Sequence, residues 1–250
     1  MSLFKPSLRV IVGQLFAFRL KSHLGFFATL VVVHALSVTF SLFIGPTIGT
    51  TMGQDWITIR DLDNAVVLHF TRLWVFVVAF LLTTKPCRNA DAPLVSNRLS
   101  STLADIAFIL TCSLLGGLLG ASSAAFVRLV AVVVYAGALV VRDSFFLAPS
   151  ALLMGSLLGS LSMALFGSLG YLSGALMRIR LGPVMLGFLL YFAVVSLIRQ
   201  YDYWSDLLRV IVNLFPYANS LPFLAAKSLG FAAVVFAMAF IATKDLEVKE

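Results

Sequence analysis

The residue types that perform chemistry in enzymes are few and widely spaced in this chain. Its three histidines, His23, His34 and His69, lack the spacing of metal ligands, and no cysteine or carboxylate cluster stands beside them. No GxxxxGK[ST] phosphate loop occurs, so ATP has no binding site of that kind. The serines of 120–123 (GASS) have no later histidine to act as a base. We therefore expect no catalytic residue, metal site or cofactor on this chain, and no enzyme acting alone.

Ionisable side chains inside apolar runs are the remaining candidates for function. Hydrophobic residues make up 60% of the chain and the mean hydropathy is +1.02, as is typical of an integral membrane protein. His34, His69 and Arg72 stand within such runs, and we take them as candidates for lining a translocation path. Arg72 follows Ala65 by seven residues, about 10 Å along a helix, so it can face a substrate path or extend to the outer surface. For His34 a hydrogen-bonded packing role is the simpler interpretation.

The elements that would position these residues are transmembrane helices. A span needs roughly 20 apolar residues, and six runs supply them: 24–44, 65–84, 103–141, 151–176, 181–198 and 221–243. The run 103–141 would form a helix of about 58 Å, so we expect a long helix, a broken helix or one with a re-entrant stretch. Little sequence remains for a soluble domain, and we predict an all-α membrane protein with a single transmembrane domain over 1–250.

The positive charges predict the orientation of these spans. Eleven of the 18 lysines and arginines fall in four short segments between or beside the runs: Lys5, Arg9, Arg19, Lys21, Lys85, Arg88, Arg98, Arg178, Arg180, Lys244 and Lys249. Short loops rich in Lys and Arg stay in the cytoplasm. We therefore expect an even number of crossings with both termini in the cytoplasm, and the net charge of +7 reflects topology, not nucleic-acid binding.

Two segments that do not span have an amphipathic pattern. In 3–20, apolar residues recur at helical spacing: Phe4, Leu8, Ile11, Leu15 and Phe18. This pattern predicts a helix that lies in the cytoplasmic interface. The segment 201–217 mixes aromatic and charged residues and is too polar to span, so we place it at the outer interface.

The loop 85–101, KPCRNADAPLVSNRLSS, is the strongest functional candidate. Asn89 or Asp91 can cap a short helix, and Pro93 is tolerated in a first turn. A short basic helix in the cytoplasm is suited to dock on a soluble partner. The alternative is a loop whose charges only set the topology.

Small residues in the spans indicate where helices pack closely. Three glycine pairs have GxxxG spacing: Gly116 and Gly120, Gly155 and Gly159, and Gly170 and Gly174. We expect these pairs to serve helix packing within one subunit, and we favour this interpretation over a specific dimer interface.

The order of these elements resembles the permease subunit of bacterial ABC exporters of the second type, the ABC-2 membrane family. The resemblance covers the whole chain: an interfacial helix, six spans, a basic cytoplasmic helix after the second span and an outer amphipathic segment before the last. Local likeness lies in 95–100 (VSNRLS), in 167–178 (GSLGYLSGALMR) and in 213–217 (NLFPY).

The resemblance implies a working assembly. Two permeases, identical or homologous, would pair with two soluble ATPase subunits that hold ATP and Mg²⁺. Asp91, Asn97 and Arg98 would contact the ATPase through a coupling helix, and 3–20 would be the family's elbow helix. The chain would lie in the bacterial plasma membrane, in contact with its lipid, and export a hydrophobic or cationic peptide, such as an antimicrobial peptide, or a drug.

Other functions stay open at this point. A lipid-linked cell-wall glycan is an alternative cargo within the same family. A stand-alone secondary transporter or channel is another possibility, although carboxylates avoid the middle of every predicted span, which disfavours coupling to protons or sodium. An assembly factor or membrane anchor without transport is a third.

Overall fold

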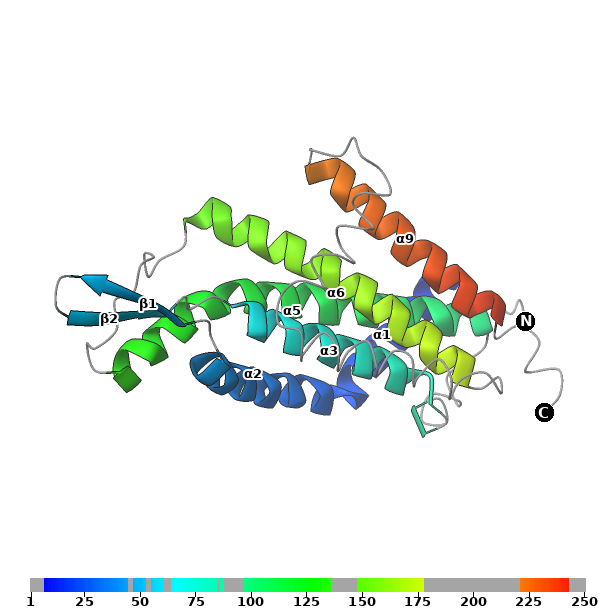
Figure 1. The fold of residues 1–250 in the computed structure, drawn as a ribbon. Coiled ribbons are helices and arrows are strands. Elements are labelled where there is room, and N and C mark those ends of the chain that lie inside the picture. Colours follow the sequence, from blue (N-terminus) through cyan, green and yellow to red (C-terminus); the bar gives the residue numbers. More distant parts are fainter. Residues whose placement is uncertain are drawn as a thin grey trace, which may run out of the picture.

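Six helices and one β-hairpin make up the described part of the chain in the computed structural model (Figure 1). The structure describes residues 7–44, 47–52, 55–60, 64–84, 86–87, 97–135, 148–177 and 221–242. The helices are α1 (Leu8–Ser22), α2 (Leu24–Ile44), α3 (Ala65–Leu82), α5 (Arg98–Tyr135), α6 (Pro149–Met177) and α9 (Leu221–Ala242). The strands are β1 (Thr47–Met52) and β2 (Asp55–Arg60).

All of these helices except α1 are long and apolar enough to cross a membrane. The apolar stretches are Leu24–Leu42, Ala65–Leu82, Leu99–Val134, Pro149–Met177 and Ala225–Ala242. The shortest have 18 residues, about 27 Å of helix, close to the ~30 Å of a hydrocarbon core. The chain therefore has the helices of a multi-pass membrane protein. The predicted fifth span, 181–198, and the predicted outer segment, 201–217, lie outside the described residues.

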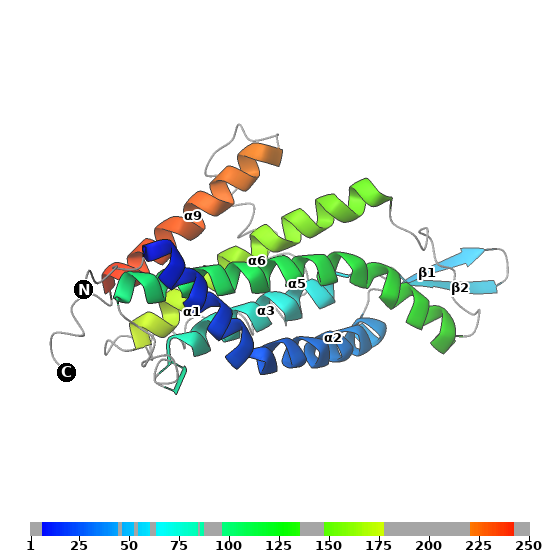
Figure 2. The same cartoon turned by 180° about the vertical axis from the view of Figure 1, so that it is seen from behind.

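The apolar helices run in two opposite directions along the bundle. In both views α2 and α5 run away from the end where α1 lies, whereas α3, α6 and α9 run toward it (Figures 1 and 2). The end of α9 and the whole of α1 thus lie at one end of the bundle, and the hairpin lies at the other.

The long third apolar run forms one helix. The helix α5 has 38 residues, about 57 Å, and begins earlier than predicted, at Arg98. Glycines in its middle do not break it, because each faces a neighbouring helix: a Cβ on Gly116 would meet Met163 and Thr71, and one on Gly117 would meet Ser160. The part of the predicted run beyond Tyr135 lies outside the described residues.

The helix α6 lies at the centre of the bundle and contacts α3, α5 and α9. Its small residues let two of these neighbours approach closely. A Cβ on Gly170 would fall on the backbone of Phe76 in α3, and one on Gly159 would lie 3.3 Å from the Cα of Gly117 in α5. The predicted packing within one subunit is therefore confirmed for these glycines.

The segment between α2 and α3 contains strands that the sequence analysis did not predict. β1 and β2 pair antiparallel, from Thr47 opposite Arg60 to Met52 opposite Asp55. Threonine and isoleucine, which favour strands, fill much of both segments, and two residues separate them in the sequence, a common length for a hairpin connection. The described fold is thus helical with one short hairpin.

The helix α1 exposes part of its predicted apolar stripe and buries one of its charges. Leu15 is buried, but Leu8 and Phe18 of the same predicted stripe are 45% and 36% exposed. Arg19, which the sequence analysis counted among the loop charges, is 2% exposed. Helix α1 packs against α5 (Figure 2), and its buried residues include this charge.

Candidate functional site

A buried ion pair joins α1 to the first turns of α5. Arg19 Nη1 lies 2.9 Å from Asp105 Oδ1. The same guanidinium donates to the carbonyl oxygen of Ser101 at 2.7 Å and to its Oγ at 2.8 Å. The hydroxyl of Tyr171 in α6 donates to Asp105 Oδ2 at 3.1 Å. We call Arg19, Ser101, Asp105 and Tyr171 the ion-pair cluster.

Helical spacing explains how this cluster forms. Ser101 and Asp105 are four residues apart on α5 and so share one face, which lets a single guanidinium contact both. Arg19 follows Leu15 by the same interval, and both are buried. Charges this deeply buried are costly unless they are paired and hydrogen-bonded, and here each finds such partners. The cluster holds α1, α5 and α6 together at one end of the bundle.

Sequence reasoning missed the ion-pair cluster. A basic residue beside an apolar run was interpreted through the charge rule for topology, which does not ask where the side chain points. Two sequence features could have indicated the ion pair. Arg19 continues the helical row of Leu15, and Asp105 is the only carboxylate in the run 103–141.

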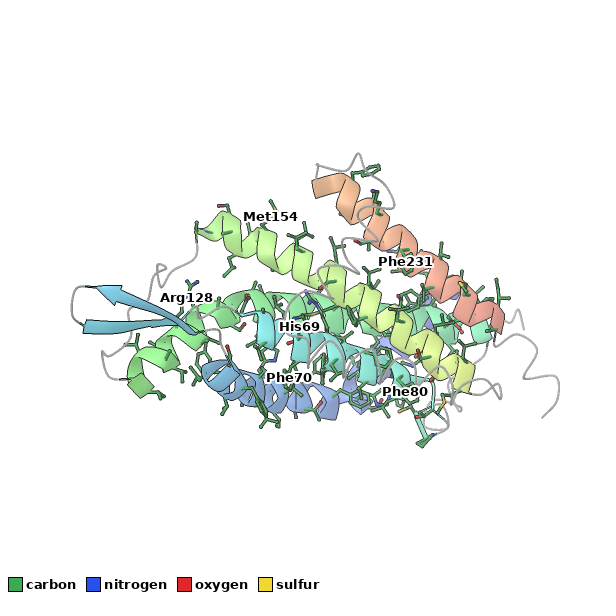
Figure 3. All side chains as sticks on the ribbon, viewed as in Figure 1. His69, Phe70, Phe80, Arg128, Met154 and Phe231 are labelled. Atoms are coloured by element: carbon green, nitrogen blue, oxygen red, sulfur yellow. The ribbon has the colours of Figure 1, made fainter. Side chains whose placement is uncertain are left out.

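Two of the three path candidates meet inside the bundle. Arg72 Nε donates to Ser162 Oγ of α6 at 3.1 Å, and Arg72 Nη1 lies 3.4 Å from His69 Nδ1. A guanidinium can only donate, so the His69 ring nitrogen accepts. Figure 3 shows His69 on α3 within the helical bundle. We call His69, Arg72 and Ser162 the arginine cluster.

The third path candidate, His34, lies apart from the arginine cluster. Its Nδ1 donates to the carbonyl oxygen of Leu30, on its own helix, at 3.0 Å. Its Nε2 is buried without a hydrogen-bond partner among the described residues. The structure thus brings His69 and Arg72 together, and it does not bring His34 to them.

The predicted coupling residues are described only in part. Asp91 lies outside the described residues, and Arg98 is the first residue of α5. Asn97 caps that helix: its Oδ1 accepts from the backbone N–H of Leu99 at 3.2 Å, and its carbonyl oxygen accepts from Ser100 Oγ at 2.5 Å. Asn97 is exposed, so it can cap α5 and still contact a partner.

No group of three or more metal-ligating side chains occurs among the described residues. No protein-family model, curated protein or solved structure matches this chain. Any functional conclusion therefore depends on the chain's own residues, their positions and their contacts.

Proposed function

We propose that this chain is the permease subunit of an ATP-driven exporter of the ABC-2 type. A second copy or a homologous permease would complete the path, and ATP hydrolysis would take place on separate ATPase subunits. The described apolar helices, the absence of a phosphate loop in the sequence and the order of elements support this proposal. Expected substrates are a hydrophobic or cationic peptide or a drug, with a lipid-linked cell-wall glycan as the alternative.

The observation that carries the proposal is the place of the ion-pair cluster. The basic loop 85–97 leads directly into α5, and Ser101 and Asp105 lie in the first turns of that helix. Through Arg19 and Tyr171, the same turns are bound to α1 and α6. A soluble ATPase that pushes on the loop would therefore move three helices together, which is what energy coupling requires of a permease.

Within this proposal, Asp91, Asn97 and Arg98 contact the ATPase. The ATPase presses on the loop, and the capped start of α5 conveys the displacement to the bundle. The amphipathic helix α1, with Leu8 and Phe18 exposed, lies along the membrane surface as an elbow helix.

A pull-down tests the proposal. Tagged chain is purified from its native cells in mild detergent and probed for a soluble partner that ATP photolabels. We expect an ATPase in about equal amount with the native chain, and a large loss of it with Arg98→Glu. Lys227→Glu is the matched control, because it reverses a charge on α9, far along the chain from the loop. Absence of any ATPase, in a detergent that keeps known transporter complexes intact, would overturn the proposal.

One observation favours a second candidate, a carrier that works alone. Arg72 and His69 form a polar contact inside a candidate span, and such residues often mark substrate pathways. Flux through the purified chain in liposomes, with no ATPase present and with loss of flux in Arg72→Gln, would favour this candidate over the exporter.

A further inference from the structure

The guanidinium of Arg72 has more donors than its described partners use. An arginine carries five N–H groups. The contacts of Arg72 are with two neutral groups, Ser162 Oγ and His69 Nδ1. Among the described residues, no carboxylate lies within ion-pair distance of it, whereas Arg19 has Asp105 at 2.9 Å. Arg72 therefore holds a positive charge that the described part of the chain does not neutralise.

The two neutral contacts also fix where this charge lies. They hold Nε and Nη1 toward α6 and α3, which prevents the side chain from simply extending to the membrane surface. Arg72 is only half-buried, and none of its nitrogens is among the fully buried polar atoms that lack a partner. Its remaining N–H groups are thus not fully enclosed by the protein, at a depth where an unpaired charge is costly.

Apolar side chains are exposed on the neighbouring helical row, the one that contains His69. Leu73 and Val77 are 38% and 43% exposed and lie one turn apart, in the row that begins at His69. A guanidinium with unused donors, one helical row from exposed apolar side chains, suits an amphiphile with an acidic head and a hydrocarbon tail. Arginine suits phosphate in particular, since its planar fork can donate two parallel hydrogen bonds to phosphate oxygens.

We infer that the arginine cluster binds the phosphate head of an amphiphile whose tail lies along Leu73 and Val77. The free N–H groups of Arg72 donate to the phosphate oxygens, and Ser162 and His69 hold the guanidinium in place. Binding itself needs no ATPase. Only the interpretation of the amphiphile as exported cargo rests on the proposed function, where it favours a lipid-linked glycan over a cationic peptide.

Native mass spectrometry of the whole chain tests this inference. The chain is purified in dodecyl maltoside, a neutral detergent, and titrated with dodecyl phosphate. We expect saturable binding of one molecule per chain, weakened at least about tenfold in Arg72→Gln, because a charged hydrogen-bonding partner is lost. The matched control is Lys227→Gln, which removes one positive charge from α9, a different span, and should change the affinity less than about twofold.

Further ligands identify the chemistry and the source of the head group. Dodecyltrimethylammonium, with the same tail and a positive head, should not compete. Inorganic phosphate should bind far more weakly, and equal affinity would overturn the role given to the apolar strip. Competition by phosphatidylglycerol would support the site with a bilayer lipid as occupant. Its absence would support the site with a phosphomonoester amphiphile.

A milder variant guards against loss of folding. Ser162→Ala leaves the charge of Arg72 in place and removes one of its two anchors, so it should weaken dodecyl phosphate binding by a smaller factor than Arg72→Gln. Equal binding by the native chain, Arg72→Gln and Ser162→Ala would overturn the inference, and so would no binding by the native chain. Because no ATPase is present, neither result depends on the pull-down.

Discussion

Replacement of Asp105 by asparagine tests whether the ion-pair cluster holds α1 to the bundle. Asparagine has nearly the same shape, so the packing of α5 is preserved while the negative charge is removed. Arg19, 2% exposed, would then face a neutral amide where it now has a carboxylate. The perturbation therefore isolates the charge from the volume of the side chain.

The expected loss of folding free energy in Asp105→Asn follows from the burial of both side chains of the ion pair. The two side chains are 2% and 10% exposed, so solvent screens the ion pair only weakly. Removing one partner of a buried pair costs about 3–5 kcal/mol, because the other charge stays buried without its counter-ion. Tyr171→Phe removes one hydrogen bond to a charged group and should cost less, about 1.5–3 kcal/mol.

Thermal unfolding in detergent, followed by circular dichroism, measures these costs. For a chain of this size each kcal/mol corresponds to about 2–4 °C, so Asp105→Asn should lower Tm by roughly 6–20 °C. Arg19→Met should act similarly. The double variant Arg19→Met with Asp105→Asn should be less destabilised than the sum of the two, with a coupling energy of about 3 kcal/mol or more.

Additive costs in that double-mutant cycle would refute the reasoning, since independent residues do not form an ion pair. A loss below about 1 kcal/mol in Asp105→Asn, a value typical of surface pairs, would show that solvent reaches the cluster.

Two further predictions concern packing and topology. Gly170→Ala places a Cβ on the carbonyl of Phe76 and should cost about 1–3 kcal/mol of stability in the same unfolding assay, whereas Gly230→Ala, with no atom within 4 Å of the new Cβ, should be neutral or slightly stabilising; equal effects would contradict the described approach of α3 and α6. In intact cells, a membrane-impermeant maleimide should label Cys87 only after lysis, and Cys112, which is fully buried, only after denaturation; labelling of Cys87 before lysis would reverse the predicted orientation.

The membrane character of the chain could be predicted from the sequence because it depends on length and polarity alone. Runs of about 20 apolar residues rarely form anything other than membrane spans. The described helices overlap five of the six predicted runs. The continuity of α5 could not be predicted, because glycines such as Gly116 and Gly117 break a helix or pack against one depending on what lies opposite.

The polar contacts were harder to predict than the helices. The arginine cluster joins residues 90 positions apart, and the ion-pair cluster joins residues 82 apart, so neither has a local pattern. His69 and Arg72 could be named as candidates because they stand out in an apolar run. Arg19 could not, since a basic residue at the end of an amphipathic helix fits the cytoplasmic surface equally well. The β-hairpin was not predicted, because short strands have a weaker sequence pattern than membrane spans.

The long sequence separation within the ion-pair cluster also sets an order of events during biosynthesis. The chain emerges from its N-terminus, and the residues that pair with Arg19 are made only after α2 and α3. Tyr171, which completes the cluster, follows another 66 residues later than Asp105. Until the first turns of α5 are made, the guanidinium of Arg19 lacks both Asp105 and Ser101 as partners. The helix α1, made before α5 and α6, is thus fixed in place only after both, and completion of the ion-pair cluster marks the point at which all three helices are present.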